Sequence, residues 1–139
     1  TKMSPNSIFD KATQIVRDST DVQRRFGTPL KVYGRDHGGH REGRRNFVEH
    51  TQYTCPEDGS DRVRVRFNVE GPHGNAFVFA EVSSSMSSGE FVYVLVQDKR
   101  NGRVMTVVDN RSALMAKKMA GANAEGQAVL ANLLGGGKN

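Results

Sequence analysis

The sequence holds a single cysteine, no tryptophan and no long apolar run. Cys55 cannot form a disulfide within the chain, and no cysteine or histidine pair around it has zinc-site spacing. The longest apolar run, 91–96, is far shorter than the roughly 20 residues of a membrane-spanning helix. No secretory or amphipathic targeting segment opens the chain. We therefore expect either a soluble protein or an anchor and address upstream of Thr1.

Neither sign of charge dominates the composition. Lys and Arg number 20 against 15 Asp and Glu, so the net charge is +5 over 139 residues. This length suits one domain, with room for a tail. A moderate basic excess favours acidic partners of any kind, whether nucleic acid, anionic lipid or an acidic peptide, but it does not indicate a fold.

The N-terminal region predicts two helices. Ser4 is the expected N-cap, with Pro5 at the first helical position. Apolar side chains then recur at helical spacing: Ile8, Phe9, Ala12, Ile15 and Val16. A second, shorter helix is expected to be capped by Ser19 or Thr20 and to end at Gly27.

After these helices the hydrophobic period changes to two. Strands are predicted over 30–33, 46–54, 62–69, 76–82, 91–96 and 103–108, joined by turns. The 91–96 strand is apolar on both faces, which predicts a central strand covered on both sides. Helices followed by a run of strands indicate an α+β fold, with the N-terminal helices packed on a largely antiparallel β-sheet.

The composition shifts to alanine and glycine after Asp109. We therefore predict a domain over 1–112 and an Ala/Gly-rich, helical or flexible C-terminal tail over 113–139. Four apolar residues could line a short amphipathic helix from about Ala124: Val129, Leu130, Leu133 and Leu134. The tail is either a separable docking element or a segment that packs back on the domain.

No motif predicts catalysis, a metal or a cofactor. His37 and His40 lack the third and fourth ligands of a zinc site. Cys55 has His50 as its nearest base in sequence, but no nucleophile signature frames the pair. The serine cluster 83–88 contains no G-x-S-x-G elbow. We therefore predict a non-enzymatic protein without metal or cofactor.

Residues 74–79 partly match the core pattern of an RNA-recognition motif. Asn75 and Ala80 replace the two outer aromatic residues that stack bases, and no predicted helix separates this strand from its neighbours. We interpret the segment as an ordinary strand with core-facing phenylalanines, Phe77 and Phe79. A nucleic-acid-binding domain remains the second alternative function.

Arginines gather in two places, and they are the candidate partner-binding residues: Arg44, Arg45, Arg62, Arg64 and Arg66. The first two belong to a basic, glycine-rich loop over 34–45. The other three project from one face of the 62–69 strand. Such a row is commonly a solvated face, yet it creates a field that can steer an acidic partner.

An ordered series of short motifs runs through most of the chain. It consists of Phe26-Gly27, Lys31-Val32-Tyr33-Gly34, Gly43-Arg44-Arg45, Tyr53, Arg64-Val65-Arg66-Phe67-Asn68-Val69-Glu70-Gly71, Gly74 with Val78 to Val82, Gly89-Glu90-Phe91 and Asp109-Asn110-Arg111. In order and spacing, the series resembles the Tim-twenty-one family of mitochondrial presequence-translocase subunits. The resemblance covers about Ile8 to Ser112.

The resemblance implies a mitochondrial inner-membrane protein with a presequence, one transmembrane helix and a domain like this one in the intermembrane space. It implies a non-enzymatic, protein-binding subunit of the presequence translocase. This subunit would link the translocase to the acidic intermembrane-space tail of the outer-membrane import receptor. It would also link the translocase to respiratory-chain complexes or their assembly intermediates. An accessory subunit or assembly factor of a respiratory-chain complex is the alternative. No specific nucleic acid is expected, and membrane contact is expected only through an upstream anchor. The chain departs from the family in lacking the membrane helix and in its longer tail after Ser112.

Overall fold

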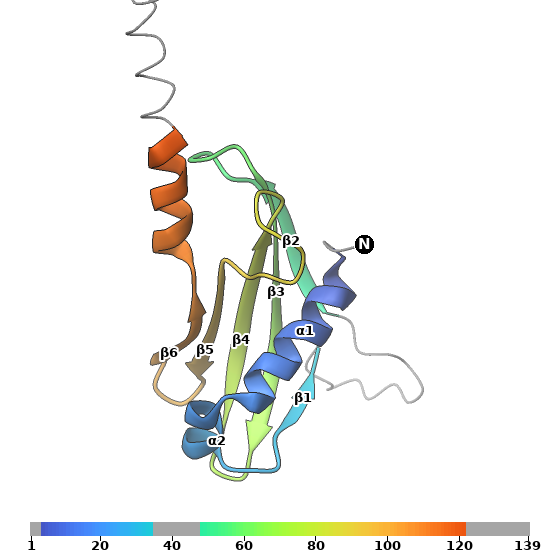
Figure 1. The fold of residues 1–139 in the computed structure, drawn as a ribbon. Helices are drawn as coiled ribbons and strands as arrows, with labels where there is room; N and C mark the ends of the chain where they lie inside the picture. Colours follow the sequence, from blue (N-terminus) through green and yellow to red (C-terminus); the bar gives the residue numbers. More distant parts are fainter. Residues whose placement is uncertain (1–3, 35–47, 122–139) are drawn as a thin grey trace, which may run out of the picture. The chain divides into compact units, whose positions relative to one another are not determined.

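The computed structural model describes residues 4–34 and 48–121. The chain forms two compact units, 1–109 and 110–139. The first unit has helices and an antiparallel β-sheet, which confirms the predicted α+β class (Figure 1).

Two N-terminal helices begin and end where the sequence predicts. In α1 (Pro5–Asp18), the Ser4 hydroxyl accepts a hydrogen bond from the Ser7 amide, and Pro5 occupies the first turn. In α2 (Thr20–Phe26), the Ser19 hydroxyl accepts from the Val22 amide. Both hydroxyls satisfy amides that have no partner within their helices. Gly27, with φ of 82°, ends α2 in a conformation that glycine adopts without strain.

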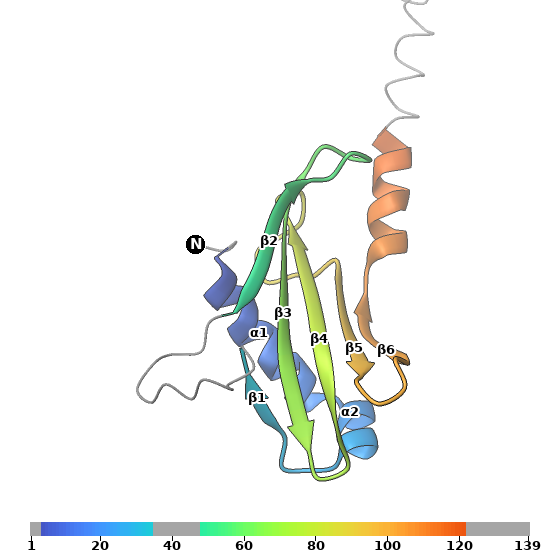
Figure 2. The ribbon, with the colours of Figure 1, turned by 180° about the vertical axis from the view of Figure 1, so that it is seen from behind.

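The six predicted strands are all present: β1 (Lys31–Tyr33), β2 (Glu49–Thr54), β3 (Asp61–Gly71), β4 (Gly74–Ser83), β5 (Tyr93–Asp98) and β6 (Val104–Asp109). They form one antiparallel sheet in the order β1-β3-β4-β5-β6, and β2 also pairs with β3 (Figure 2). β1 lies along residues 68–70 of β3, and β2 lies along residues 61–66 of the same edge. Both strands therefore share the edge of β3 that does not pair with β4.

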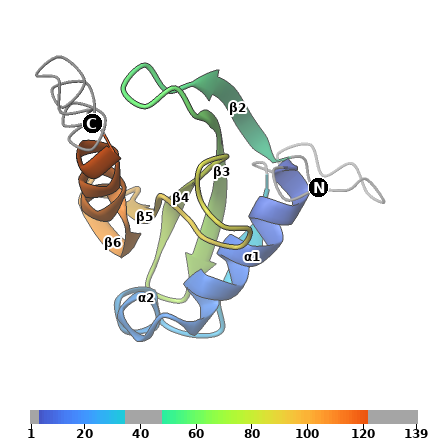
Figure 3. The same ribbon diagram turned by 45° about the horizontal axis from the view of Figure 1, so that its top comes forward.

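The hydrophobic core lies between α1 and one face of the sheet. Figure 3 shows α1 lying across that face. α1 buries Ile8, Ala12 and Val16. Alternate residues of β3 and β4 meet them: Val63, Val65, Phe67, Val69, Ala76, Val78, Ala80 and Val82. The Phe67 ring packs edge-on against Phe9 of α1, with ring centres 4.9 Å apart.

Neither helix of the first unit lies on the opposite side of the sheet in the described residues, so we call that side the open face (Figure 2). β5 is inside the sheet, between β4 and β6, as predicted for the 91–96 strand. The prediction that this strand is covered on both sides is wrong. Val94 and Val96 are buried on the helix side, but Tyr93 and Leu95 are only half-buried on the open face.

The prediction that Phe77 and Phe79 face the core is also wrong. Residues paired across two strands point to the same side of a sheet. Phe67 is opposite Val78, so the register that buries Phe67 also buries Val78 and turns the phenylalanines away. Both lie half-buried on the open face.

The second unit begins with a helix over 111–121, in which the Leu114 amide donates to the Asn110 carbonyl over 2.9 Å. The tail over 113–139 was predicted to be helical or flexible, with a helix placed only from about Ala124, whereas the structure already has a helix from residue 111. Met115 and Met119 are exposed on it. The predicted apolar stripe Val129–Leu134 lies outside the described residues. Within the described ranges, no helix is long and apolar enough to cross a bilayer.

Candidate functional site

The open face presents three neighbouring rows of side chains. β3 contributes Arg62, Arg64 and Arg66; β4 contributes Phe77, Phe79 and Glu81; β5 contributes Tyr93 and Leu95. The register places Arg66 opposite Phe79, and Phe79 opposite Leu95. A cationic row therefore runs beside an aromatic row, which runs beside a row with an aliphatic side chain.

Arg62 is not part of the exposed surface. Only 8% of the residue is accessible, and its guanidinium donates to Glu81 over 2.7 Å and to Asp58 over 3.0 Å. Its Nε also donates to the Ser60 hydroxyl over 2.9 Å. The expectation that all three strand arginines stand on an exposed polar face is therefore wrong for Arg62. A buried cation keeps its charge only where carboxylates and acceptors surround it, as they do here.

Glu81 is the acceptor at the centre of this buried network. Besides Arg62, it accepts hydrogen bonds from the hydroxyls of Tyr53, over 2.8 Å, and Tyr93, over 2.9 Å. Burial and the negative charge of Glu81 raise the pKa of Tyr93 to about 12. The Ser60 backbone amide and Arg62 hold the pKa of Asp58 below its ordinary value. These two groups therefore keep one protonation state at neutral pH, which suits a structural network.

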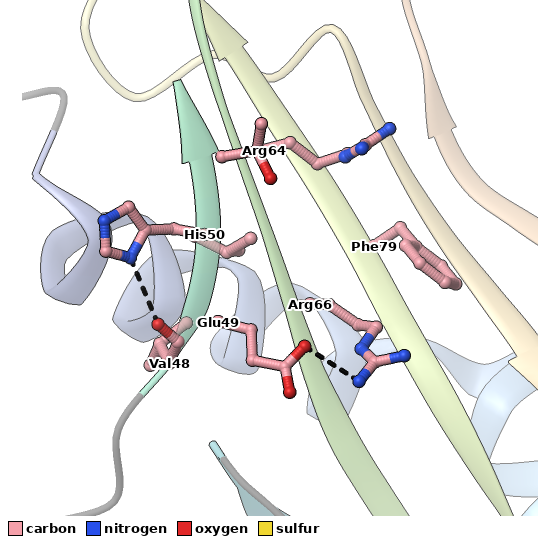
Figure 4. A pocket seen from close by; sticks show the side chains of 8 residues that line it. Val48, Glu49, His50, Arg64, Arg66 and Phe79 are labelled. Carbon is pink, nitrogen blue, oxygen red and sulfur yellow. Dashed lines mark hydrogen bonds and ion pairs between the residues drawn. The ribbon is translucent and has the colours of Figure 1, made fainter. Parts of the chain in front are cut away.

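Arg64 and Arg66 remain accessible on the open face. Arg64 is exposed. Arg66 forms an ion pair with Glu49 of β2 over 2.8 Å, and both side chains are about two-fifths exposed, at 41% and 43%. Figure 4 shows Glu49 reaching from β2 to Arg66, while His50 turns away toward the Val48 carbonyl. An exposed pair of this kind contributes only about 0–1 kcal/mol, so Arg66 can exchange Glu49 for another carboxylate.

A hollow of about 700 Å³ lies at these arginines. It is lined by Val48, Glu49, His50, Thr51, Arg64, Val65, Arg66 and Phe79 (Figure 4). Two arginines and one phenylalanine therefore border the same space. This combination can receive a carboxylate and an apolar group together.

Phe77 lies next to Phe79, and its ring contacts two cations. The guanidinium carbon of Arg66 is 4.6 Å from the ring centre, and the ammonium nitrogen of Lys99 is 4.5 Å from it. Lys99 also donates to the Asn68 side-chain oxygen over 2.9 Å. These contacts hold positive charge against the aromatic row.

The sequence patterns missed the aromatic row. The sequence did contain a signal for this row, because Glu81, Phe77 and Phe79 are at alternate positions and so lie on the same face of the strand. An acidic residue in phase with them indicates the face that no helix covers. Nothing in the sequence signals that Glu81 would meet Arg62.

The other candidate residues are placed as follows. Arg44, Arg45, His37 and His40 lie outside the described residues. Cys55 is buried after β2. Over 4–34 and 48–121, no group of three or more histidine, cysteine or acidic side chains could hold a metal ion.

Comparison with known proteins connects this geometry to a family. The TIM21 family model matches residues 1–111. The mitochondrial import inner membrane translocase subunit Tim21 of Bos taurus is 37% identical over 113 residues, covering 78% of this chain and 44% of the relative. The protein of the same name from Rattus norvegicus is 39% identical over 114 residues, covering 78% and 43%. The chain thus spans less than half the length of these curated relatives.

A solved structure has the same fold. The structure of the intermembrane-space (IMS) domain of the mitochondrial import protein Tim21 from S. cerevisiae superposes with a TM-score of 0.58 at 19% identity, covering 76% of this chain and 92% of that one. At this identity the likeness establishes the fold alone. The family-model match and the two mammalian relatives carry the assignment, and they agree with the resemblance seen in the motifs: this chain belongs to the Tim21 family.

Proposed function

We propose that this chain is the intermembrane-space domain of a non-enzymatic, protein-binding subunit of the mitochondrial inner-membrane presequence translocase. Its family membership supports the assignment, because its relatives are named as import translocase subunits. The fold supports the compartment, because the similar yeast structure is described as an intermembrane-space domain.

The open face is the proposed binding surface, and its ligand is the acidic intermembrane-space tail of the outer-membrane import receptor. The observation that carries this proposal is the pair Arg64 and Arg66, which border one hollow on a face that neither α1 nor α2 covers. Arginine suits the task because its planar fork can donate two hydrogen bonds to one carboxylate. Arg44 and Arg45 are proposed to add to the same basic surface. Arg62 is not part of this exposed surface; its hydrogen bond to Glu81 instead stabilises the strands that form it.

Binding by exposed ion pairs is expected to be modest in affinity and sensitive to salt. Each pair contributes about 0–1 kcal/mol, so several must act together. The Debye length falls from about 10 Å at 0.1 M salt to about 3 Å at 1 M, so affinity should fall over that range.

Charge reversal on β3 tests the proposal. The double variant Arg64→Glu/Arg66→Glu should remain folded and lose binding to a fluorescent acidic peptide in an anisotropy titration. The matched control is Arg17→Glu/Arg24→Glu, which makes the same change in net charge at exposed helix positions. If the control loses binding equally, net charge rather than the open face attracts the peptide. If the β3 variant binds normally, the surface is elsewhere.

Contact with respiratory-chain complexes or their assembly intermediates belongs to the same proposal, since the family resemblance implies it. Purifying the full-length protein from mitochondria tests this part. Recovery of translocase subunits with respiratory complexes supports the linking role. Recovery of respiratory subunits alone, in fixed stoichiometry, would instead indicate an accessory subunit or assembly factor.

A further inference from the structure

We propose that the segment bound at the open face carries, beside its carboxylates, one aromatic or branched aliphatic side chain that packs on Phe79 and Leu95. This inference rests on the proposed function and makes its ligand more specific. The ligand is an acidic peptide segment with a single apolar anchor, rather than a uniformly acidic one.

The position of Phe79 is the first observation. It lies on β4 directly between Arg66 of β3 and Leu95 of β5. Phe79 and Leu95 are both half-buried on a face that α1 and α2 leave uncovered. The Phe79 ring also lines the hollow that Arg64 and Arg66 border. An apolar group entering this hollow would therefore meet a ring with two cations beside it.

The neighbouring ring shows why Phe79 is the anchor site. Phe77 is already in contact with Arg66 and Lys99, at 4.6 and 4.5 Å from its centre. No comparable cation lies over Phe79 in the described part of the chain. The two rings are 6.3 Å apart and tilted by 58°, so they form one continuous aromatic surface of which only the Phe79 end borders the hollow.

Charge complementarity determines the spacing of the acidic side chains in the ligand. Arg64 and Arg66 are two residues apart on one strand, so their backbone positions are about 7 Å apart. Acidic side chains at positions i and i+2 of an extended segment, or i and i+4 of a helix, have similar spacing. The apolar anchor then lies on the β4 and β5 side of those two carboxylates.

The energetics explain why an anchor is needed. An exposed ion pair changes an affinity by a factor of about five or less. Burying a leucine-sized side chain against an apolar surface changes it by about tenfold or more. The anchor also removes water from beside the arginines, and that strengthens their attraction to carboxylates. Part of the affinity should consequently persist at high salt.

Two synthetic peptides of equal length and equal negative charge test the inference. They differ only at one position within the acidic run, which is leucine in one and serine in the other. Titrated against the full chain, the leucine peptide should bind about tenfold more tightly. This ratio should be nearly unchanged between about 0.1 and 0.5 M salt, although both affinities fall.

Variants of the chain locate the anchor site. Phe79→Ser and Leu95→Ser should each abolish most of the advantage of the leucine peptide. Val104→Ser is the matched control, because it removes an exposed apolar side chain from β6 and should leave the advantage intact. Circular dichroism verifies folding of each variant, and the two-peptide comparison on the unaltered chain needs no variant.

The outcomes separate this inference from the proposed function. If both peptides bind equally, and both lose affinity with Arg64→Glu/Arg66→Glu, the apolar anchor is refuted while acidic binding stands. If neither peptide binds, the acidic ligand and the anchor are refuted together. The affinity of oligouridine of the same charge for the open face at Phe79 can be compared with that of the leucine peptide at physiological salt. If oligouridine binds more tightly, the open face is a nucleic-acid platform, and the inference is overturned.

Discussion

Arg62 and Glu81 form a buried ion pair across β3 and β4, with 2.7 Å between Nη1 and Oε2 and with side chains that are 9% and 2% exposed. The residues are diagonal neighbours, since Arg62 is directly opposite Ser83 and Glu81 is directly opposite Arg64. The pair thus joins two positions of the open face. Glu81 also accepts hydrogen bonds from the hydroxyls of Tyr53 on β2 and Tyr93 on β5. Side chains from four strands, β2, β3, β4 and β5, therefore meet at Glu81.

Removing one partner of this pair should destabilise the domain strongly. In Glu81→Ala, Arg62 stays buried with only Asp58 as a counter-charge, and the expected loss is about 3 kcal/mol of unfolding free energy. Urea denaturation followed by circular dichroism measures it. The control is Glu49→Ala, which breaks the exposed pair with Arg66 and should cost no more than about 1 kcal/mol. Equal losses in the two variants would show that the buried network is not a major source of stability.

Acid should destabilise the domain partly through Asp58. The Ser60 backbone amide is the main cause that lowers the pKa of this carboxyl, and Arg62 adds to the effect. Because the folded pKa lies below the unfolded value of about 3.9, the stabilisation is present above that pH and is lost as pH falls toward the folded pKa. Unfolding free energies measured between about pH 6 and pH 2 should therefore fall less steeply for Asp58→Asn than for the unaltered chain. Parallel curves would contradict this assignment.

Gly71 should not tolerate a side chain. A Cβ there would collide with the carbonyl oxygen of Phe26 and lie 2.9 Å from its carbonyl carbon. That same oxygen accepts a hydrogen bond from the His73 amide over 2.9 Å, so it cannot move without cost. Gly71→Ala should lower the unfolding free energy by about 1–3 kcal/mol. Gly121→Ala is the control, because its added Cβ would meet no described atom within 4 Å outside its own stretch of helix; a comparable loss there would contradict the steric explanation.

Deleting residues 113–139 should leave the thermal stability of the domain nearly unchanged. Among the described residues, the core cluster contains only positions before 110, and residues 1–109 form a compact unit of their own. We expect the melting temperature to change by less than about 2 °C, measured by calorimetry. A fall of about 5 °C or more would mean that the tail contributes to the core, and would refute the view of it as a separable element.

Local signals in the sequence predicted the elements of this fold well. Ser4 and Pro5 mark the start of α1 because capping depends on neighbouring residues alone. The alternation of Val63, Val65 and Phe67 likewise identifies β3 and its buried face.

The faces of β4 are harder to assign, because both of its phases contain apolar residues and only Glu81 distinguishes one phase from the other. Pairing with β3 shows directly that Val78 is buried and Phe79 is not. The burial of Arg62 depends on its contact with Glu81, 19 positions away in the chain. Strand periodicity has no information about that contact. The candidate site was therefore predicted in its charge, through Arg64 and Arg66, but not in its aromatic row.

The shared edge of β3 has a consequence for how this family can diversify. Tyr33 is opposite Asn68 and Glu49 is opposite Arg66, so β1 ends and β2 begins two positions apart on one strand. The ends of the intervening segment are thus fixed next to each other whatever its length. Doubling the length of such a segment costs only about 0.6 kcal/mol in closure entropy. Insertions between Tyr33 and Glu49 should therefore cost little folding free energy, so this junction can accept added sequence while the sheet stays unchanged.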